Sequence, residues 1–144
     1  MAKRILLVED NEDDEIMTVR SLRNGGFTGA IEVVRDGQEA CDWLFCEGDH
    51  EGREVTRPDV VLLDIRLPKR SGLQVLEAIR SDSRTRHLPV VMLTSSDEQQ
   101  DLARSYDLHA NSYVRKPMSL AEFQRAMQSL GVYWTEFNRA PMRS

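Results

Sequence analysis

Five short apolar runs recur along the chain, and polar stretches separate each run from the next. They occupy residues 5–8, 31–34, 60–63, 90–93 and 113–114. The runs are rich in β-branched residues and nearly continuous rather than alternating, which is typical of strands buried on both faces of a sheet. The pattern therefore predicts five short strands.

The stretches after these runs have helical length and carry apolar residues at intervals of three or four. Asn11, which can cap a helix, comes just before the first of them. The predicted stripes are Ile16, Val19 and Leu22; Ala40, Trp43 and Leu44; Leu73, Val75, Leu76 and Ile79; Leu102, Ala103 and Tyr106; and Leu120, Phe123, Met127 and Leu130. A strand followed by a helix, five times over, predicts a parallel sheet with right-handed crossovers and helices on both faces.

Three segments without periodicity are interpreted as connections. Residues 46–57 are charged and predict a solvated loop, and residues 84–87 predict an exposed turn before the fourth strand. Gly25, Gly26 and Gly29 are not followed by the Lys-Ser/Thr pair of a phosphate-binding loop, so they are expected to end a helix and form a turn.

Composition narrows the class of protein. The 144 residues suit one domain, and no apolar run approaches the roughly 20 residues that span a bilayer. Only four apolar residues lie between Arg4 and Glu9, too few for the apolar region of a signal peptide. Cys41 and Cys46 are too few for a disulfide scaffold and have no partner at metal-ligand spacing, so we expect them to pack. These features predict a soluble cytoplasmic protein without membrane contact.

The formal net charge of −5 argues against nucleic-acid binding. The negative charge is concentrated in one stretch, because residues 9–15 contain six acids and no base. Without those six acids the remaining chain would be close to neutral. The acidity is thus a local feature that begins at the end of the first predicted strand.

Polar residues that could bind a ligand or take part in a reaction follow four of the predicted strands. Glu9 and Asp10 follow the first run and Asp64 follows the third; Thr94 follows the fourth and Lys116 the last. Ligands of open α/β sheets bind outside the carboxyl ends of the strands, so we expect these side chains to converge. Any one of them alone would be an ordinary polar residue entering a loop.

This set of groups suits phosphoryl transfer. Three neighbouring carboxylates repel one another, and a hard divalent cation such as Mg²⁺ relieves that repulsion. Lysine and threonine can pair with phosphoryl oxygens, and an aspartate can act as the nucleophile and become an aspartyl phosphate. The constellation predicts transfer onto a carboxylate by positioning and charge neutralisation.

Four motifs in this order resemble the receiver domain of two-component response regulators. They are LLVEDN at residues 6–11, LLDIRLP at 62–68, LTSS at 93–96 and YVRKP at 113–117. The resemblance covers about residues 4–130 and implies a flavodoxin-like (βα)5 doubly wound sheet with strand order 2-1-3-4-5. The long acidic loop and the aromatic C-terminus look like the stand-alone regulators paired with bacterial and cyanobacterial phytochrome histidine kinases.

The resemblance also implies roles for individual residues. Asp64 would accept a phosphoryl group from the histidine of a sensor kinase. Mg²⁺, with Mn²⁺ as an alternative, would be held by Glu9, Asp10, Asp64 and the backbone carbonyl of Arg66. Thr94 and Lys116 would bind the phosphoryl group, Tyr113 would be the switch aromatic, and a cis peptide bond would precede Pro117.

Two residues depart from the common pattern. Glu9 stands where many members carry aspartate, so the metal shell has a longer side chain. Arg66, two residues after the acceptor, would overlook the phosphoryl group; the sequence leaves open whether it speeds or slows hydrolysis.

The C-terminal segment has heptad-like spacing beyond the expected end of the domain. The apolar positions that step by three and four are Leu120, Phe123, Met127, Leu130, Trp134 and Phe137. We divide the chain into a receiver domain over residues 1–130 and an extension over 131–144, and assign Leu130, Trp134 and Phe137 to a homodimer contact. The alternative is that the aromatic residues fold back on their own domain.

The sequence therefore predicts a signalling protein rather than an enzyme, whose output is a protein contact or a phosphate relay. The alternative from another class is an Asp-nucleophile phosphatase or phosphotransferase. Such enzymes carry a second aspartate two residues after the nucleophile as general acid, whereas Arg66 cannot donate a proton at neutral pH. A degenerate receiver acting only as a structural dimer is disfavoured because the expected residue types are all present.

Overall fold

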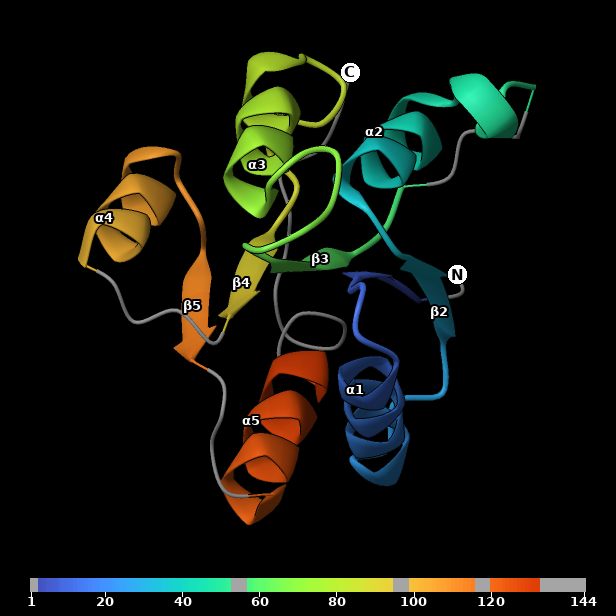
Figure 1. Cartoon of the computed structure of the whole chain (residues 1–144). Coiled ribbons are helices and arrows are strands. Elements are labelled where there is room, and N and C mark those ends of the chain that lie inside the picture. Colours follow the sequence, from blue (N-terminus) through green and yellow to red (C-terminus); the bar gives the residue numbers. More distant parts are fainter. Residues whose placement is uncertain (1–2, 53–56, 95–98, 116–119, 133–144) are drawn as a thin grey trace.

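A computed structural model describes residues 3–52, 57–94, 99–115 and 120–132 as five strands, five α-helices and one short 3₁₀ helix (Figure 1). The strands are β1 (Arg4–Val8), β2 (Ala30–Val34), β3 (Val60–Asp64), β4 (Val90–Thr94) and β5 (Ser112–Arg115). The helices are α1 (Glu12–Asn24), α2 (Gly37–Phe45), η1 (Gly48–His50), α3 (Gly72–Ser81), α4 (Gln99–Asp107) and α5 (Leu120–Val132).

All strand pairings are parallel, and the sheet order is β2-β1-β3-β4-β5. This confirms the predicted flavodoxin-like topology. The register places Val8 of β1 beside Leu63 of β3 and Asp64 beside Leu93 of β4. The carboxyl ends of β1, β3 and β4 therefore meet at one edge of the sheet.

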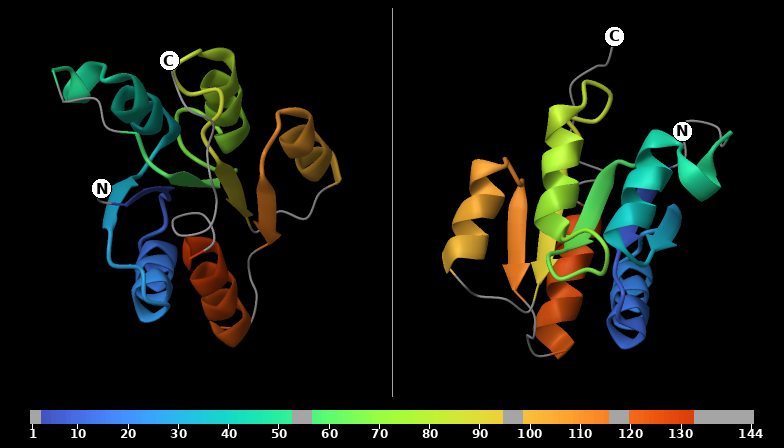
Figure 2. Two further views of the ribbon diagram at one scale, coloured as in Figure 1. Left: turned by 180° about the vertical axis from the view of Figure 1, so that it is seen from behind. Right: turned by 45° about the horizontal axis from the view of Figure 1, so that its top comes forward.

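Helices cover both faces of the sheet (Figures 1 and 2). On one face α1 and α5 pack side by side, and Leu22, Phe123 and Met127 contact alternate residues of the central strands. On the other face, α2 and α3 bury Trp43 and Ile79 against the remaining strand residues. The core positions predicted for Phe123, Met127 and Trp43 are confirmed.

The central strands are almost completely buried, as their continuous apolar runs predict. Residues 5–8 of β1 are 0% exposed and residues 60–63 of β3 are at most 1% exposed. At the edge, β2 is only partly buried except at Val34. Two-sided burial thus applies to the middle of the sheet and weakens at this edge.

The ends of α1, which the sequence predicts, and the start of α3 have a visible chemical basis. The Asn11 side chain accepts a hydrogen bond from the backbone N–H of Asp14 at 2.9 Å and so caps α1. Gly25 ends α1, and Gly26 follows with a φ of 99° that glycine adopts without strain. Ser71 and Gln74 form a reciprocal capping box at the start of α3.

The cysteines also lie as predicted, on α2 and just after it. Cys41 is buried, and its Sγ accepts a hydrogen bond from Arg70 at 3.3 Å. Burial raises the pKa of the Cys41 thiol in spite of the nearby Arg70 charge, so a packing role as a thiol is favoured. Cys46 ends α2 in the left-handed conformation, at the entry to the loop that contains η1.

Three sequence expectations were wrong in detail. Thr85 lies in the segment predicted to be an exposed turn, yet it is 0% exposed and its hydroxyl donates to the carbonyl of Ile79 at 2.7 Å. Ile16 and Tyr106, which belong to predicted apolar stripes, are 42% and 50% exposed. Neither side chain belongs to the two described core clusters, so the stripes on α1 and α4 are only partly covered.

No helix in the described part of the chain is long and apolar enough to cross a membrane.

We predict that Thr85→Val lowers the free energy of unfolding by about 1 kcal/mol, because the side chain keeps its shape but loses the bond to Ile79. Denaturant unfolding followed by circular dichroism measures this. Thr28→Val, the same change at an exposed threonine, is the control and should be nearly neutral. Equal unfolding midpoints for the two variants would contradict the structural role of the Thr85 hydroxyl.

Candidate functional site

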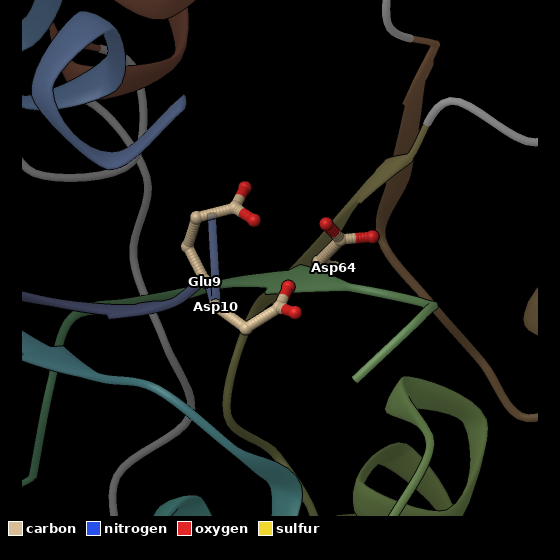
Figure 3. Close-up of side chains that lie close together, drawn as sticks. All are labelled: Glu9, Asp10 and Asp64. Carbon is tan, nitrogen blue, oxygen red and sulfur yellow. The ribbon is translucent and has the colours of Figure 1, made fainter. Parts of the chain in front are cut away.

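Three carboxylates meet at the carboxyl edge of the sheet, as the strand-end argument predicts (Figure 3). Glu9 and Asp10 directly follow β1, and Asp64 is the last residue of β3. One oxygen from each of the three side chains lies within 4.8 Å of the others. The parallel pairing of β1 with β3 explains why these side chains lie together. It places Val8 beside Leu63, so Glu9 and Asp64, which follow them, leave the strands at the same edge.

The backbone fixes two of these carboxylates. Glu9 is 1% exposed, and its Oε2 accepts a hydrogen bond from the N–H of Asn11 at 3.3 Å. Asp64 is 8% exposed, and its Oδ1 accepts from the N–H of Arg66 at 3.2 Å. Asp10 is exposed to solvent. The cluster therefore has a buried side and a side open to an incoming group.

A cavity of about 570 Å³ lies beside the cluster. Its described lining comes from the loop after β3, the start of α3 and the loop after β1. The lining residues are Asp10, Ile65, Arg66, Leu67, Pro68, Ser71 and Leu73. The Arg66 side chain is exposed at this cavity. The predicted position of Arg66 beside the acceptor is thus compatible with the structure.

The loop after β3 is held by contacts that the sequence motifs do not reveal. The N–H of Gly37 donates to the carbonyl of Pro68 at 3.2 Å, and Lys69 forms an ion pair with Asp36 at 3.6 Å. The N–H of Gly72 donates to the carbonyl of Ile65 at 2.7 Å. A side chain at position 72 would overlap the carbonyl oxygen of Asp64, so only glycine permits this close return of the chain.

Backbone register places two other predicted residues near the same edge. Thr94 ends β4, one residue after the partner of Asp64, and pairs with Arg115 of β5. Tyr113 pairs with Met92. The side chains of Thr94 and Tyr113, and the whole of Lys116 and Pro117, lie outside the described residues. The same is true of the Leu130 side chain and of Trp134 and Phe137.

The donor set matches a hard divalent cation. Carboxylate oxygens are the ligands that Mg²⁺ prefers, and Mg²⁺ is commonly bound by one or two carboxylates with water and phosphate oxygens in the remaining positions. Three negative charges within 4.8 Å also repel, and a cation would remove that repulsion. Glu9, Asp10 and Asp64 can therefore hold a metal ion while leaving room for a phosphoryl group.

Comparison with known proteins adds an independent line of evidence. A family model described as the response regulator receiver domain matches residues 5–128. The chain is 44% identical over 137 residues to the probable methanogenesis regulatory protein FilR2 of Methanothrix harundinacea (strain 6Ac), covering 95% of this chain and 86% of FilR2. It is 34% identical over 134 residues to the response regulator Rcp1 of a Synechocystis species, covering 93% of this chain and 90% of Rcp1.

Solved structures agree with these relatives. The phosphorylated cyanobacterial phytochrome response regulator RcpA superposes with a TM-score of 0.90 at 36% identity, covering 99% of this chain and all of RcpA. The Mn²⁺-bound form of Rcp1 gives a TM-score of 0.88 at 34% identity, covering 97% of this chain and 99% of Rcp1. The similarity therefore extends over nearly the full length of both proteins.

We predict that Asp10→Asn raises the melting temperature by about 3 °C in the absence of divalent cations, because one of three repelling charges is removed. The same variant should gain less stability than the parent when Mg²⁺ is added, because a ligand is lost. Thermal unfolding with and without the metal ion measures both effects.

Asp13→Asn is the matched control, since Asp13 is exposed in the first turn of α1 and outside the cluster. This change removes a negative charge that interacts favourably with the N-terminal end of α1. The melting temperature of the variant should therefore fall slightly or stay the same. A rise as large in this control as in Asp10→Asn would refute repulsion within the cluster.

Proposed function

The chain belongs to the response regulator receiver family, and from this premise we propose that Asp64 is the residue that accepts the phosphoryl group. A response regulator of this family is phosphorylated by a histidine kinase of a two-component system. The observation that carries the assignment is the position of Asp64, at the carboxyl end of the central strand and within 4.8 Å of two further carboxylates.

In the proposed reaction, an oxygen of the Asp64 carboxylate attacks the phosphorus of the kinase phosphohistidine. A P–O bond forms as the P–N bond breaks, and the electron pair of that bond returns to the imidazole nitrogen. The N–H of Arg66 binds Oδ1 of Asp64 and so restricts the rotation of the nucleophile. Positioning and charge compensation provide the catalysis, because no difficult proton transfer is required.

The residues that would hold a divalent metal ion are Glu9, Asp10 and Asp64, with the backbone carbonyl of Arg66. When bound, Mg²⁺ supplies positive charge that offsets both the carboxylates and the phosphoryl oxygens. The Mn²⁺-bound form of Rcp1 supports a divalent cation in this family, and the oxygen-only donor set supports Mg²⁺ as the ion used here. The hydrogen bond from the N–H of Asn11 holds the carboxylate of the longer Glu9 side chain in the cluster.

The proposed switch uses residues at the ends of β4 and β5. Thr94 would bind the phosphoryl group and Lys116 would pair with it, while Tyr113 would change position and Pro117 would follow a cis peptide bond. The β4–β5 register supports this proposal, since it pairs Thr94 with the residue that precedes Lys116. A new charge on Asp64 then biases two states of this region, and the output is a contact with another protein.

We assign the chain to signalling rather than to phosphate hydrolysis. Arg66 lies at the position where an Asp-nucleophile phosphatase needs its acid, and no comparison favours such an enzyme. Phosphoryl transfer to Asp64, and its later hydrolysis, is then chemistry that the protein performs on itself with a bound metal ion. The protein changes state and is regenerated, without turning over a small substrate.

The sensor kinase is proposed to be of the phytochrome type. RcpA is named as a cyanobacterial phytochrome response regulator, and its superposition covers 99% of this chain and all of RcpA. We place the receiver domain in residues 1–130 and the extension in 131–144. Leu130, Trp134 and Phe137 are assigned to a homodimer contact on the basis of their heptad-like spacing.

We predict that the parent protein gains one phosphoryl group when incubated with acetyl phosphate and Mg²⁺, whereas Asp64→Asn gains none, because an amide is a poor nucleophile. Intact mass spectrometry measures the gain. Asp107→Asn, which removes an exposed acid at the end of α4, should be phosphorylated like the parent. A phosphorylated Asp64→Asn variant would show that the acceptor has been assigned wrongly.

We predict that Trp134→Ala combined with Phe137→Ala lowers the sedimenting mass from dimer to monomer, because two large apolar side chains leave the interface. Analytical ultracentrifugation of the parent and the variant makes the comparison. Tyr106→Ala, which removes a half-exposed aromatic residue on α4, is the control and should leave the mass unchanged. Identical masses for parent and double variant would rule out the proposed contact.

A further inference from the structure

A second cavity lies at the opposite end of the sheet from the carboxylate cluster. Its volume is about 690 Å³, and its described lining consists of Arg80, Arg86, His87, His109 and Asn111. These residues come from the end of α3, the loop that enters β4 and the loop that enters β5 (Figure 1). The cavity is therefore at the amino ends of β4 and β5, and its described lining shares no residue with the described lining of the cavity beside Asp64.

Arg80 forms the fixed part of this cavity. Its guanidinium donates to the carbonyls of Arg86 at 3.2 Å and Leu88 at 2.7 Å, and twice to the carbonyl of His109 at 3.1 and 2.7 Å. It also donates to Oδ1 of Asn111 at 3.1 Å. All five N–H groups thus bind neutral oxygens, and the network ties both loops to α3.

The positive charge of Arg80 has no carboxylate partner among the residues that the structure describes. Its half-buried guanidinium has a lowered pKa because burial disfavours the charged form, with no acid to oppose that effect. All N–H donors of Arg80 are engaged by neutral oxygens, but no described carboxylate neutralises its positive charge. Such a cation attracts an anion electrostatically without forming a hydrogen bond to it. Arg80 can therefore organise an anion site as a positioning residue.

Three further side chains could contact such an anion. Arg86, His87 and His109 are exposed at the cavity, where Arg86 adds a positive charge and each imidazole ring can donate a hydrogen bond. His109 has a φ of 62°, and the two bonds from Arg80 to its carbonyl fix this left-handed backbone. The two loops thus present these three side chains on a backbone that Arg80 holds in place.

Nearby acids do not neutralise this charge. Asp82 binds Arg84 at 2.8 Å, and that hydrogen bond lowers the pKa of Asp82 to about 2. On the other side, Glu77 pairs with Arg104 at 3.3 Å, and Asp107 does not line the cavity. In a chain of net charge −5, a cavity whose described lining contains basic residues and no acid is a local exception.

We propose that this cavity binds a small multivalent oxyanion, a molecule with two or more phosphate or carboxylate groups. Arg86, His87 and His109 contact the ligand, and Arg80 holds the loops and adds a fixed charge. The volume accommodates a small molecule. The site is spatially separate from the one around Asp64, because none of its described lining residues belongs to the carboxylate cluster.

The test is a titration of the full chain with inorganic pyrophosphate and, separately, with citrate, followed by amide NMR in metal-free buffer at constant ionic strength. Binding should shift the amide signals of residues 86–88 and 109–112. Arg86→Glu should weaken binding by about tenfold through charge repulsion. A response to pyrophosphate alone assigns the site to phosphate ligands, and a response to citrate alone assigns it to carboxylates.

Arg20→Glu is the matched control, because it makes the same charge change at an exposed arginine on α1. Its affinity for the probe should equal that of the parent. The combination His87→Ala and His109→Asn should also weaken binding, since asparagine tolerates the left-handed backbone at position 109. The proposal is overturned if neither probe shifts these signals at millimolar concentration, or if Arg20→Glu weakens binding as much as Arg86→Glu.

Discussion

The site depends on one constraint, the parallel pairing of two completely buried strands. Because β1 and β3 run in the same direction with Val8 beside Leu63, the residues that follow them leave the sheet at the same edge. Glu9, Asp10 and Asp64 are brought together by this geometry, although their mutual repulsion opposes it. Burial of the apolar strand residues on both faces provides the stabilisation that offsets that repulsion, so the core holds a site that would not assemble by itself.

The loop after β3 shows how the same constraint extends outward from the sheet. Asp64 must leave β3 with its side chain toward Asp10, and the chain must then turn back immediately into α3. Gly72 permits that return, since its N–H binds Ile65 and any side chain there would meet the Asp64 carbonyl. The bond from Gly37 to Pro68 ties the loop to α2. The position of the nucleophile is consequently set by the core, by a glycine and by a neighbouring helix.

Local and periodic patterns in the sequence predict the strands, the helices and the residues at the strand ends. Continuous β-branched runs identify all five strands, and the residues that follow them identify the carboxylate cluster, because strand ends are a topological property. Burial of Thr85 depends on a bond to Ile79, six residues away, and the Arg80 network joins residues about thirty apart. Such contacts leave no periodic signal, so a turn predicted to be exposed proved to be partly internal.

The two ends of the sheet carry charges of opposite sign. Six acids within residues 9–15 account for the net negative charge. Glu9 and Asp10 belong to the cluster where a divalent cation and then a phosphoryl group would bind, and the other four acids follow in the first turn of α1. The amino ends of β4 and β5 carry the opposite charge, on Arg80 and Arg86. Since β4 and β5 run from that basic cavity to Thr94 and Arg115, a ligand that ties the two entry loops together would act on the same two strands whose far ends form the proposed switch. The parallel sheet thus gives each end its own charge, and β4 and β5 contribute to both ends.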